Sequence, residues 1–157
     1  MGISPYLKGL RDHVGSALIM VPGVIAIILD GDGRVLLQRR GDNGQWGLPG
    51  GAVDPGETPA GAIVREVREE TGLEVIPERI AAVIGGPDMR LTYPNGDVVE
   101  VSATVFACRV TGGRLVADGG ETLDLAYFGR SALPPLYPPV TVKVLECLDG
   151  GAWFQPA

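Results

Sequence analysis

The sequence predicts one α/β domain in which a mixed sheet packs against helices. Three observations support this: strand-like apolar runs recur along the chain, strong turn signals separate them, and a helix with clear start and stop residues lies among them. With 157 residues, of which 45% are hydrophobic, the chain is long enough for one core and short for two. Residues 1–157 are therefore expected to form a single domain.

The first part of the chain predicts a helix, two strands and a loop. Residues 1–15 are expected to form a leading helix, because their apolar residues recur at helical spacing: Tyr6, Leu7, Leu10 and Val14. The aliphatic run 24–29 and the segment 34–40 read as two strands joined by a tight Asp-Gly-Asp-Gly turn, with the first strand buried on both faces. Residues 41–56 are so rich in Gly and Pro that we expect a loop.

The next helix has the best-defined ends in the sequence. Thr58 suits the N-cap position, Pro59 the first helical position and Gly72 the stop. On a helical wheel, five residues form one arc that is expected to dock on a sheet: Ala60, Ile63, Val64, Val67 and Thr71.

The remainder of the chain predicts mostly strands. Apolar stretches at 73–76 and 80–84 are followed by 90–93 and 98–110, which Pro94-Asn95-Gly96-Asp97 joins as a hairpin. Residues 123–128 are expected to form the last strand. Apolar residues along one face then predict a closing helix over 138–149.

Composition excludes several classes of function. A net charge of −6 and a pI near 4.7 disfavour binding to nucleic acid or to anionic membranes, so an anionic substrate would need a cation. The apolar run 17–29 is too short for a membrane span, and no signal-peptide cleavage site follows it, which favours a cytoplasmic enzyme. Cys108 and Cys147 lie far apart without CxxC spacing and are expected to be reduced core residues.

One face of the helix after Thr58 is acidic. Glu66, Glu69 and Glu70 stand at i, i+3 and i+4, where each like-charged pair costs about 0.2 to 0.5 kcal/mol. The face is either solvated and balanced by Arg65 and Arg68, or it binds a cation.

The surrounding sequence decides between these interpretations. Gly51-Ala52-Val53-Asp54-Pro55-Gly56-Glu57, seven further residues and then Arg65-Glu66-Val67-Arg68-Glu69-Glu70-Thr71-Gly72-Leu73 resemble the Nudix box, which here covers residues 51–73. The flanking strands and the segment Trp46 to Gly50 are also similar to that family. The resemblance implies an α/β/α sandwich with a mixed central sheet. It also implies a pyrophosphohydrolase that cleaves the diphosphate linkage of a nucleoside diphosphate joined to another group.

The resemblance also implies which residues form the site. Hard divalent cations neutralise the diphosphate, so Mg²⁺ is the expected cofactor, with Mn²⁺ able to substitute. The expected metal ligands are Glu66, Glu69, Glu70, the carbonyl of Gly50 and Glu121.

Other residues are expected to act beside the metal. Glu66 is either a shared ligand or the base that deprotonates water, and Glu69 belongs to the same catalytic set. Arg65 would clamp Glu69 or Glu57, and Glu57 is equally compatible with a structural and a catalytic role. The expected substrate contacts are Arg39, Arg40 and Trp46.

The substrate is left open by the sequence. ADP-ribose or a nucleotide sugar is favoured, because Pro87 lies near a proline of ADP-ribose-cleaving Nudix members. A normal or oxidised nucleoside triphosphate is the alternative within the same class. Alternatives of other classes are a non-catalytic nucleotide-sensing module and an isomerase of isoprenoid diphosphates. The expected partner is thus a small nucleoside diphosphate derivative, and family resemblance adds a possible homodimer.

Overall fold

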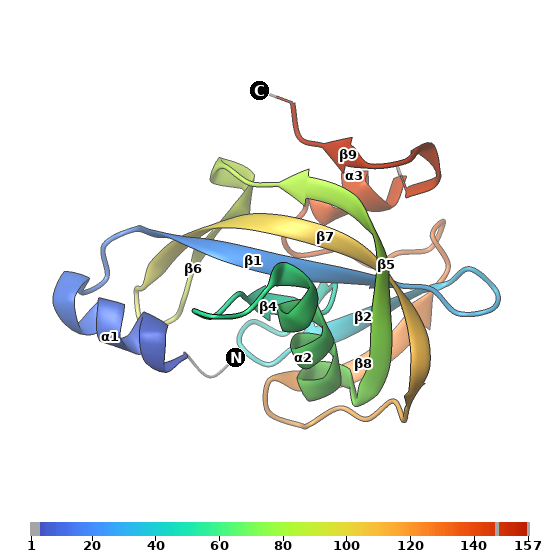
Figure 1. Cartoon of the computed structure of the whole chain (residues 1–157), viewed down its shortest axis with the longest axis horizontal. Coiled ribbons are helices and arrows are strands. Elements are labelled where there is room, and N and C mark those ends of the chain that lie inside the picture. Colours follow the sequence, from blue (N-terminus) through green and yellow to red (C-terminus); the bar gives the residue numbers. More distant parts are fainter. Residues whose placement is uncertain (1–3, 147, 157) are drawn as a thin grey trace.

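The computed structural model describes residues 4–146 and 148–156. Figure 1 shows two sheets with helices around them. The elements are, in chain order, α1 (Pro5–Val14), β1 (Ile19–Ile28), β2 (Val35–Arg40), β3 (Trp46–Gly47), β4 (Gly50–Ala52), α2 (Pro59–Thr71), β5 (Leu73–Ile84), the 3₁₀ turn η1 (Pro87–Met89), β6 (Arg90–Thr92), β7 (Val98–Gly113), β8 (Thr122–Phe128), α3 (Thr141–Glu146), the 3₁₀ turn η2 (Leu148–Gly150) and β9 (Trp153–Phe154).

The larger sheet is mixed, as the sequence predicts. Its strand order is β4-β1-β7-β5-β9, and β6 pairs with β7 outside this path. The pairs β1–β7 and β5–β9 are parallel, whereas the other neighbours are antiparallel. The smaller sheet has the order β3-β2-β8 and is antiparallel.

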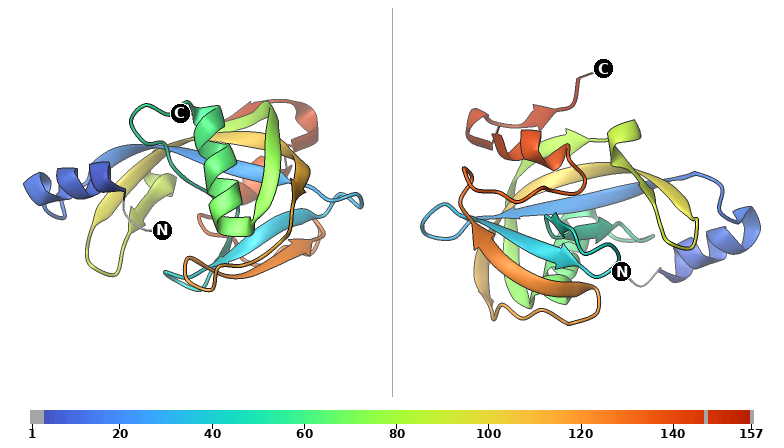
Figure 2. Two further views of the ribbon diagram at one scale, coloured as in Figure 1. Left: turned by 60° about the horizontal axis from the view of Figure 1, so that its bottom comes forward. Right: turned by 180° about the vertical axis from the view of Figure 1, so that it is seen from behind.

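Strand β1 has apolar residues on both faces, so two hydrophobic clusters form on opposite sides of the larger sheet. Val24, Ala26 and Ile28 face the cluster that contains α2, while Ile25 and Ile27 face the cluster that contains α3. Figure 2 shows α2 and α3 on opposite sides of the sheet. This arrangement confirms the α/β/α prediction.

The expected hairpin of strands 24–29 and 34–40 is wrong, because the two strands lie in different sheets. β1 starts earlier than predicted and belongs to the larger sheet, while β2 belongs to the smaller one. Only an isolated bridge, Leu29 to Val35, joins them near the turn. The turn therefore carries the chain from one sheet to the other. The sequence does not reveal this change, because both strands are apolar on both faces and lack the alternation of polar and apolar residues that would assign each face.

The expected loop 41–56 contains the short strands β3 and β4. β4 has no side chain larger than a methyl group, so no hydrophobic pattern marks it in the sequence. Its glycines let it lie against β1: a Cβ at Gly50 would be 2.2 Å from the carbonyl oxygen of Val24. The sequence also divided 73–84 into two stretches, whereas β5 runs through both with irregularities in its pairing.

The end of the chain differs from the prediction in two ways. β8 is followed by another strand, β9, and the closing helix is shorter than 138–149. The prolines at 138 and 139 delay the helix, because a residue before proline avoids helical conformation. The first turn closes with i to i+3 hydrogen bonds, as from the N–H of Val142 to the carbonyl of Pro139 at 3.1 Å. Cys108 is buried and unbridged, and Cys147 lies outside the described residues.

Candidate active site

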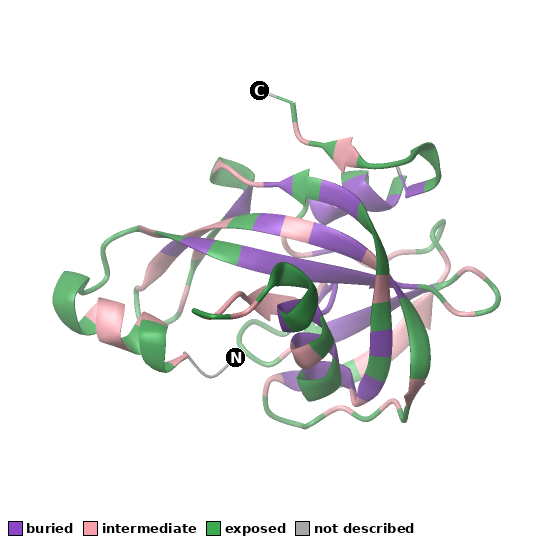
Figure 3. Ribbon diagram, in the orientation of Figure 1, coloured by how far each residue is buried: buried purple, intermediate pink, exposed green. Residues whose placement is uncertain are grey.

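Helix α2 carries the acidic residues and is fixed at both ends. The hydroxyl of Thr58 accepts a hydrogen bond from the N–H of Gly61 at 3.1 Å, and Pro59 follows in the first turn. Gly72 ends the helix in the left-handed conformation, with φ 72°. Figure 3 shows the side of α2 toward the sheets buried and the opposite side exposed. The predicted bounds of this helix are confirmed.

The predicted docking arc of α2 is partly wrong. Ala60 and Val64 are exposed, whereas Glu66 and Glu70 are each only 5% exposed. The helix packs against both β4 and β5, and the side toward β4 meets two glycines instead of apolar side chains. Space is thereby left for carboxylates inside the protein. Of the acidic face, only Glu69 remains exposed to solvent.

Arg65 is the centre of an ion-pair network. Its guanidinium binds both carboxylate oxygens of Glu57, from Nε to Oε1 at 2.7 Å and from Nη2 to Oε2 at 2.8 Å. Nη1 donates to Glu66 at 2.9 Å and to Glu69 at 3.3 Å, and Nη2 also donates to the carbonyl of Ala52. Bidentate pairs of this kind hold both partners in one geometry. Arg65 thus links the loop before α2 to two of the helix carboxylates.

Glu57 is held in its charged form by this network. The Arg65 hydrogen bonds lower the pKa of Glu57 to about 2, and the N–H of Asp54, at 3.0 Å, favours the carboxylate further. Glu57 in turn raises the pKa of Arg65. The pair is therefore charged across the physiological range. Glu57 thus binds Arg65 from the loop before the helix.

Glu66 is packed directly against the backbone of β4. A Cβ at Gly51 would lie 2.2 Å from Oε1 of Glu66, so only glycine leaves this carboxylate its place. Burial raises the pKa of Glu66, and the hydrogen bond from Arg65 acts in the opposite direction. Glu66 is consequently a stronger proton acceptor than a carboxylate in water.

Glu70 is held through one of its two oxygens. Oε2 accepts a hydrogen bond from Nε2 of Gln38 at 3.0 Å and another from the N–H of Gly50 at 2.8 Å. Burial raises its pKa to about 8, although both hydrogen bonds favour the charged form. A carboxylate in such a place needs a positive partner to remain charged at neutral pH.

These residues border a cleft of about 700 Å³, a size that suits a nucleotide-sized ligand. Its lining includes Arg65, Glu66 and Glu69 from α2, together with Glu121. Helix α1, which projects beyond the end of the sheet in Figures 1 and 2, and the β6–β7 hairpin form the opposite wall. Arg11 fixes that wall, donating to the carbonyl of Val98 at 2.7 Å.

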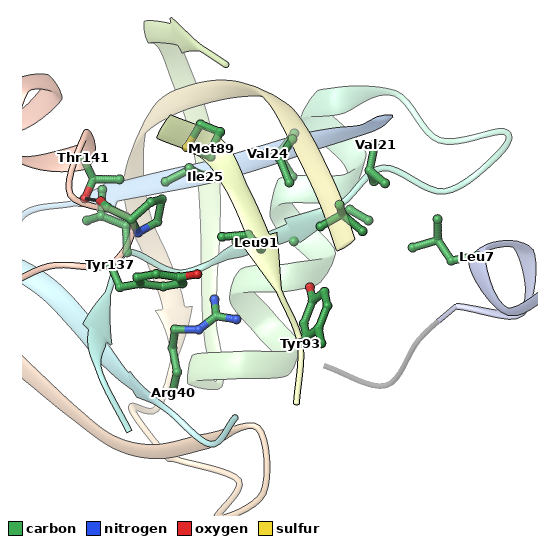
Figure 4. A pocket seen from close by; sticks show the side chains of 17 residues that line it. Leu7, Val21, Val24, Ile25, Arg40, Met89, Leu91, Tyr93, Tyr137 and Thr141 are labelled. Atoms are coloured by element: carbon green, nitrogen blue, oxygen red, sulfur yellow. Dashed lines mark hydrogen bonds between the residues drawn. The ribbon is translucent and has the colours of Figure 1, made fainter. Parts of the chain in front are cut away.

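A smaller cavity of about 100 Å³ lies beside the cleft (Figure 4). Tyr93 borders both spaces, and Arg40 and Tyr137 reach the smaller one from β2 and from the segment before α3. The guanidinium of Arg40 lies 5.9 Å from the centre of the Tyr137 ring, a cation–π distance. Arg40 also donates twice to Asp42, at 2.9 and 2.6 Å. This cavity offers aromatic faces next to a positive charge.

The three residues expected to contact substrate are neighbours on the paired strands β2 and β3, but their surroundings differ. Arg40 borders the smaller cavity, but Arg39 is exposed and borders neither that cavity nor the cleft. Trp46 packs against the cluster around α3, with its ring 5.0 Å from that of Phe128. Arg39 and Arg40 are successive residues of β2 and point to opposite sides of the strand, so only Arg40 reaches the cavity.

Two polar residues of this region were missed by the sequence analysis. Gln38 interrupts the apolar strand β2 and is 2% exposed, a signal that was available because buried amides need partners. Tyr137 carried no comparable signal, since it lies between prolines far from the Nudix box.

The acidic residues match a divalent cation in their donor chemistry. Within residues 4–146 and 148–156, no three acidic, histidine or cysteine side chains converge as a ready metal site. Arg65 binds the oxygens of Glu66 and Glu69, and Glu70 is held by Gln38 and Gly50. Glu69 is 59% exposed and has room to turn, and carboxylate oxygens are the ligands that Mg²⁺ prefers. The set therefore fits the cofactor that the sequence predicts.

Comparison with known proteins identifies the fold and the acidic helix together. The model of the NUDIX domain matches residues 20–146, which include β1 apart from its first residue, the glycine-rich β4, α2 and α3. The chain belongs to the NUDIX family. It is a Nudix pyrophosphohydrolase that acts on nucleotide derivatives, and Nudix hydrolases generally use divalent metal ions. No helix in the described part of the chain is long and apolar enough to cross a membrane.

The Nudix proteins that are similar to this chain differ from one another in their named substrates. An ADP-ribose pyrophosphatase of Methanocaldococcus jannaschii is 38% identical over 130 residues, which cover 80% of this chain and 73% of the relative. The nucleoside triphosphatase NudI of Escherichia fergusonii is 33% identical over 112 residues, which cover 66% of this chain and 79% of NudI. Among solved structures, an ADP-ribose pyrophosphatase from Streptococcus suis superimposes with a TM-score of 0.70 at 29% identity, covering 86% of this chain and 98% of that one.

Proposed function

We propose that this Nudix enzyme hydrolyses the diphosphate linkage of a nucleoside diphosphate joined to another group, of the ADP-ribose or nucleotide-sugar type. The observation that carries the proposal is that the acidic cleft and the smaller cavity, which Arg40 and Tyr137 also line, share Tyr93 as a lining residue. An aromatic cavity beside a positive charge suits a base or ribose, while the larger cleft leaves room for a second group beyond the diphosphate. The relative from Methanocaldococcus jannaschii supports this class of substrate.

The proposed ligands of the divalent cation, Mg²⁺ or Mn²⁺, lie on α2 and the loops around it. They are Glu66, Glu69, Glu70, the carbonyl of Gly50 and Glu121. When bound, the cation would neutralise the negative charge of the diphosphate and of the attacking water. Glu69 and Glu121 border the cleft where a diphosphate would enter, and Glu70 borders a small hollow together with Glu121.

Glu66 is the proposed base. It takes a proton from a water molecule, whose oxygen forms a bond to one phosphorus while the bond from that phosphorus to the bridging oxygen breaks. The products are a nucleoside monophosphate and a second phosphorylated compound. The bridging oxygen stays with the product whose phosphorus is not attacked. The raised pKa of Glu66 favours proton uptake, and Arg65 holds its carboxylate in place.

Arg65 and Glu57 are proposed to act as positioning residues. Because Glu57 binds two of the guanidinium nitrogens, Arg65 directs its third nitrogen, Nη1, toward Glu66 and Glu69. Without Glu57, Arg65 would be free to turn toward solvent or toward substrate phosphate. The bidentate pair thus keeps the cleft's positive charge at one point.

The experiment is a substrate panel with the purified full chain. ADP-ribose, nucleotide sugars, dinucleotides and normal and oxidised nucleoside triphosphates are each incubated with Mg²⁺, and the phosphorylated products are identified. The proposal expects the highest kcat/KM for ADP-ribose or a nucleotide sugar, with a nucleoside monophosphate as product. A higher value for triphosphates, with release of pyrophosphate, would favour the alternative that the relative NudI supports. The Glu70→Gln variant controls for contaminating hydrolases.

The same panel separates the other classes. Binding without turnover of any compound would indicate a nucleotide-sensing module, although the residues of the Nudix box are all present. A cytoplasmic location and a homodimer remain predictions. Light scattering on the purified chain tests the latter through its molar mass.

A further inference from the structure

A buried chain of polar side chains reaches Glu70 from the smaller sheet. Gln38 lies on β2 and is 2% exposed, and Thr122 lies at the start of β8 and is fully buried. The hydroxyl of Thr122 donates to Oε1 of Gln38 at 2.8 Å, and Nε2 of Gln38 donates to Oε2 of Glu70 at 3.0 Å. Burying polar groups of this kind costs free energy unless each has a hydrogen-bond partner. Here the amide oxygen of Gln38 is paired with Thr122 and its amide nitrogen with Glu70.

Thr122 and Glu70 bind the two ends of the Gln38 amide. An amide has an acceptor oxygen on one side and a donor nitrogen on the other. An ionised carboxylate only accepts hydrogen bonds, so Glu70 takes the amide nitrogen, and the hydroxyl of Thr122 supplies a donor to the amide oxygen on the other side. With the amide reversed, its oxygen would face the carboxylate of Glu70 and repel it. The hydroxyl therefore acts on Glu70 through the side chain between them.

The two donors to Glu70 bind the same oxygen. Gln38 and the N–H of Gly50 both reach Oε2, so the carboxylate is fixed from β2 and from β4 at once. No hydrogen bond reaches Oε1 from the residues that the structure describes. Glu70 and Gln38 also border a hollow that Arg40, Asp42 and Glu121 complete. One oxygen is anchored, and the other is left for a ligand.

We propose that Gln38, held in place by its hydrogen bond from Thr122, is a positioning residue that anchors Oε2 of Glu70 and so presents Oε1 to the divalent cation. The inference rests on the proposed function, in which Glu70 is a metal ligand. Groups that orient a metal ligand from behind change metal affinity by about 10- to 100-fold when they are removed. A merely structural role would lower stability without changing the affinity of the folded protein.

The test measures Mn²⁺ affinity in the full chain without substrate, by electron paramagnetic resonance of free Mn²⁺. Thr122→Val removes the hydroxyl and keeps the shape, and Thr122→Ser keeps the hydroxyl. The inference expects Thr122→Val to raise the Kd for Mn²⁺ by about 3-fold or more and Thr122→Ser to stay near the parent value. Gln38→Met, which keeps the length without the donor, should raise the Kd by about 10-fold or more. Thr111→Val is the matched control, because its exposed hydroxyl donates to the carbonyl of Glu74 and not to Gln38 or Glu70.

The outcomes separate this inference from the proposed function. If Glu70→Gln weakens Mn²⁺ binding while Thr122→Val and Gln38→Met bind it like the parent, the positioning role is refuted and the ligand role stands. If Glu70→Gln itself binds Mn²⁺ like the parent, the ligand assignment fails and the inference fails with it. Circular dichroism identifies folded variants, and if Gln38→Met does not fold, the Thr122→Val and Thr122→Ser pair decides.

Discussion

Gly51 lies so close to the carboxylate of Glu66 that a Cβ at position 51 would be 2.2 Å from Oε1 and 2.4 Å from Cδ. The obstacle is the far end of a flexible side chain, so Gly51→Ala should fold and move Glu66 instead of disturbing the sheet. We expect kcat to fall by about 10-fold or more, because the proposed base would be displaced. Gly9→Ala is the control, since its Cβ would meet no atom within 4 Å. Unchanged kcat in Gly51→Ala would argue against Glu66 as the base.

The ion pair of Glu57 and Arg65 predicts a loss of stability in acid. The pKa of Glu57 is lowered from 4.5 to about 2 in the folded protein, so its contribution to the free energy of unfolding is fully present above about pH 4.5. It is lost as the pH falls toward 2. In Glu57→Gln this contribution is absent at every pH. Urea unfolding between pH 2 and 6, with metal chelated, should therefore show the difference between parent and variant shrinking as the pH falls; a constant difference would contradict the pKa.

The neighbouring arginines of β2 should differ in their effect on substrate. Arg40 borders the smaller cavity, whereas Arg39 is exposed and borders neither the cavity nor the cleft. Arg40→Gln is expected to raise KM by about 10-fold, the effect of losing one hydrogen bond to a charged group. Arg39→Gln serves as the control of matched chemistry and should leave KM within about 2-fold. Equal effects of the two variants would show that substrate does not enter that cavity.

The cap of α2 should contribute measurably to stability. Thr58→Ala removes the acceptor for the N–H of Gly61 and should lower the free energy of unfolding by about 1 kcal/mol. Ser4→Ala removes the corresponding cap of α1 and should cost less, because α1 has no buried residues. Urea titration of both variants measures the two values. The opposite order would mean that α1 contributes more to the folded core than its exposure indicates.

A divalent cation should stabilise the folded protein through α2. Clustered carboxylates repel one another, and a ligand that binds only the folded state stabilises it by an amount that grows with the logarithm of free ligand concentration over Kd. Mg²⁺ well above its Kd should raise the melting temperature by about 5 °C or more relative to protein in chelator. Glu70→Gln should show a much smaller rise. A melting temperature that Mg²⁺ leaves unchanged in the parent protein would contradict binding at this site.

The larger sheet shows where sequence patterns stopped being informative. The β6–β7 hairpin was predictable because its turn residues stand next to each other in the chain. The strands that pair with β1 and β2 could not be predicted, since β1 and β2 are apolar on both faces and each could pair with several other strands. β4 was missed because Gly and Ala leave no pattern of side chains, although it is the strand that makes room for Glu66 and Glu70.

The sequence alone determined the family, the bounds of α2 and the spacing of its carboxylates, because caps, glycine stops and helical spacing act between residues that are neighbours in the chain. Only the tertiary structure decided which carboxylates are buried, that Glu70 is held through one oxygen by Gln38, and that Arg40, not Arg39, meets Tyr137. Those contacts join residues from separate elements of the chain. They depend on how whole elements pack, and no short stretch of sequence encodes that packing.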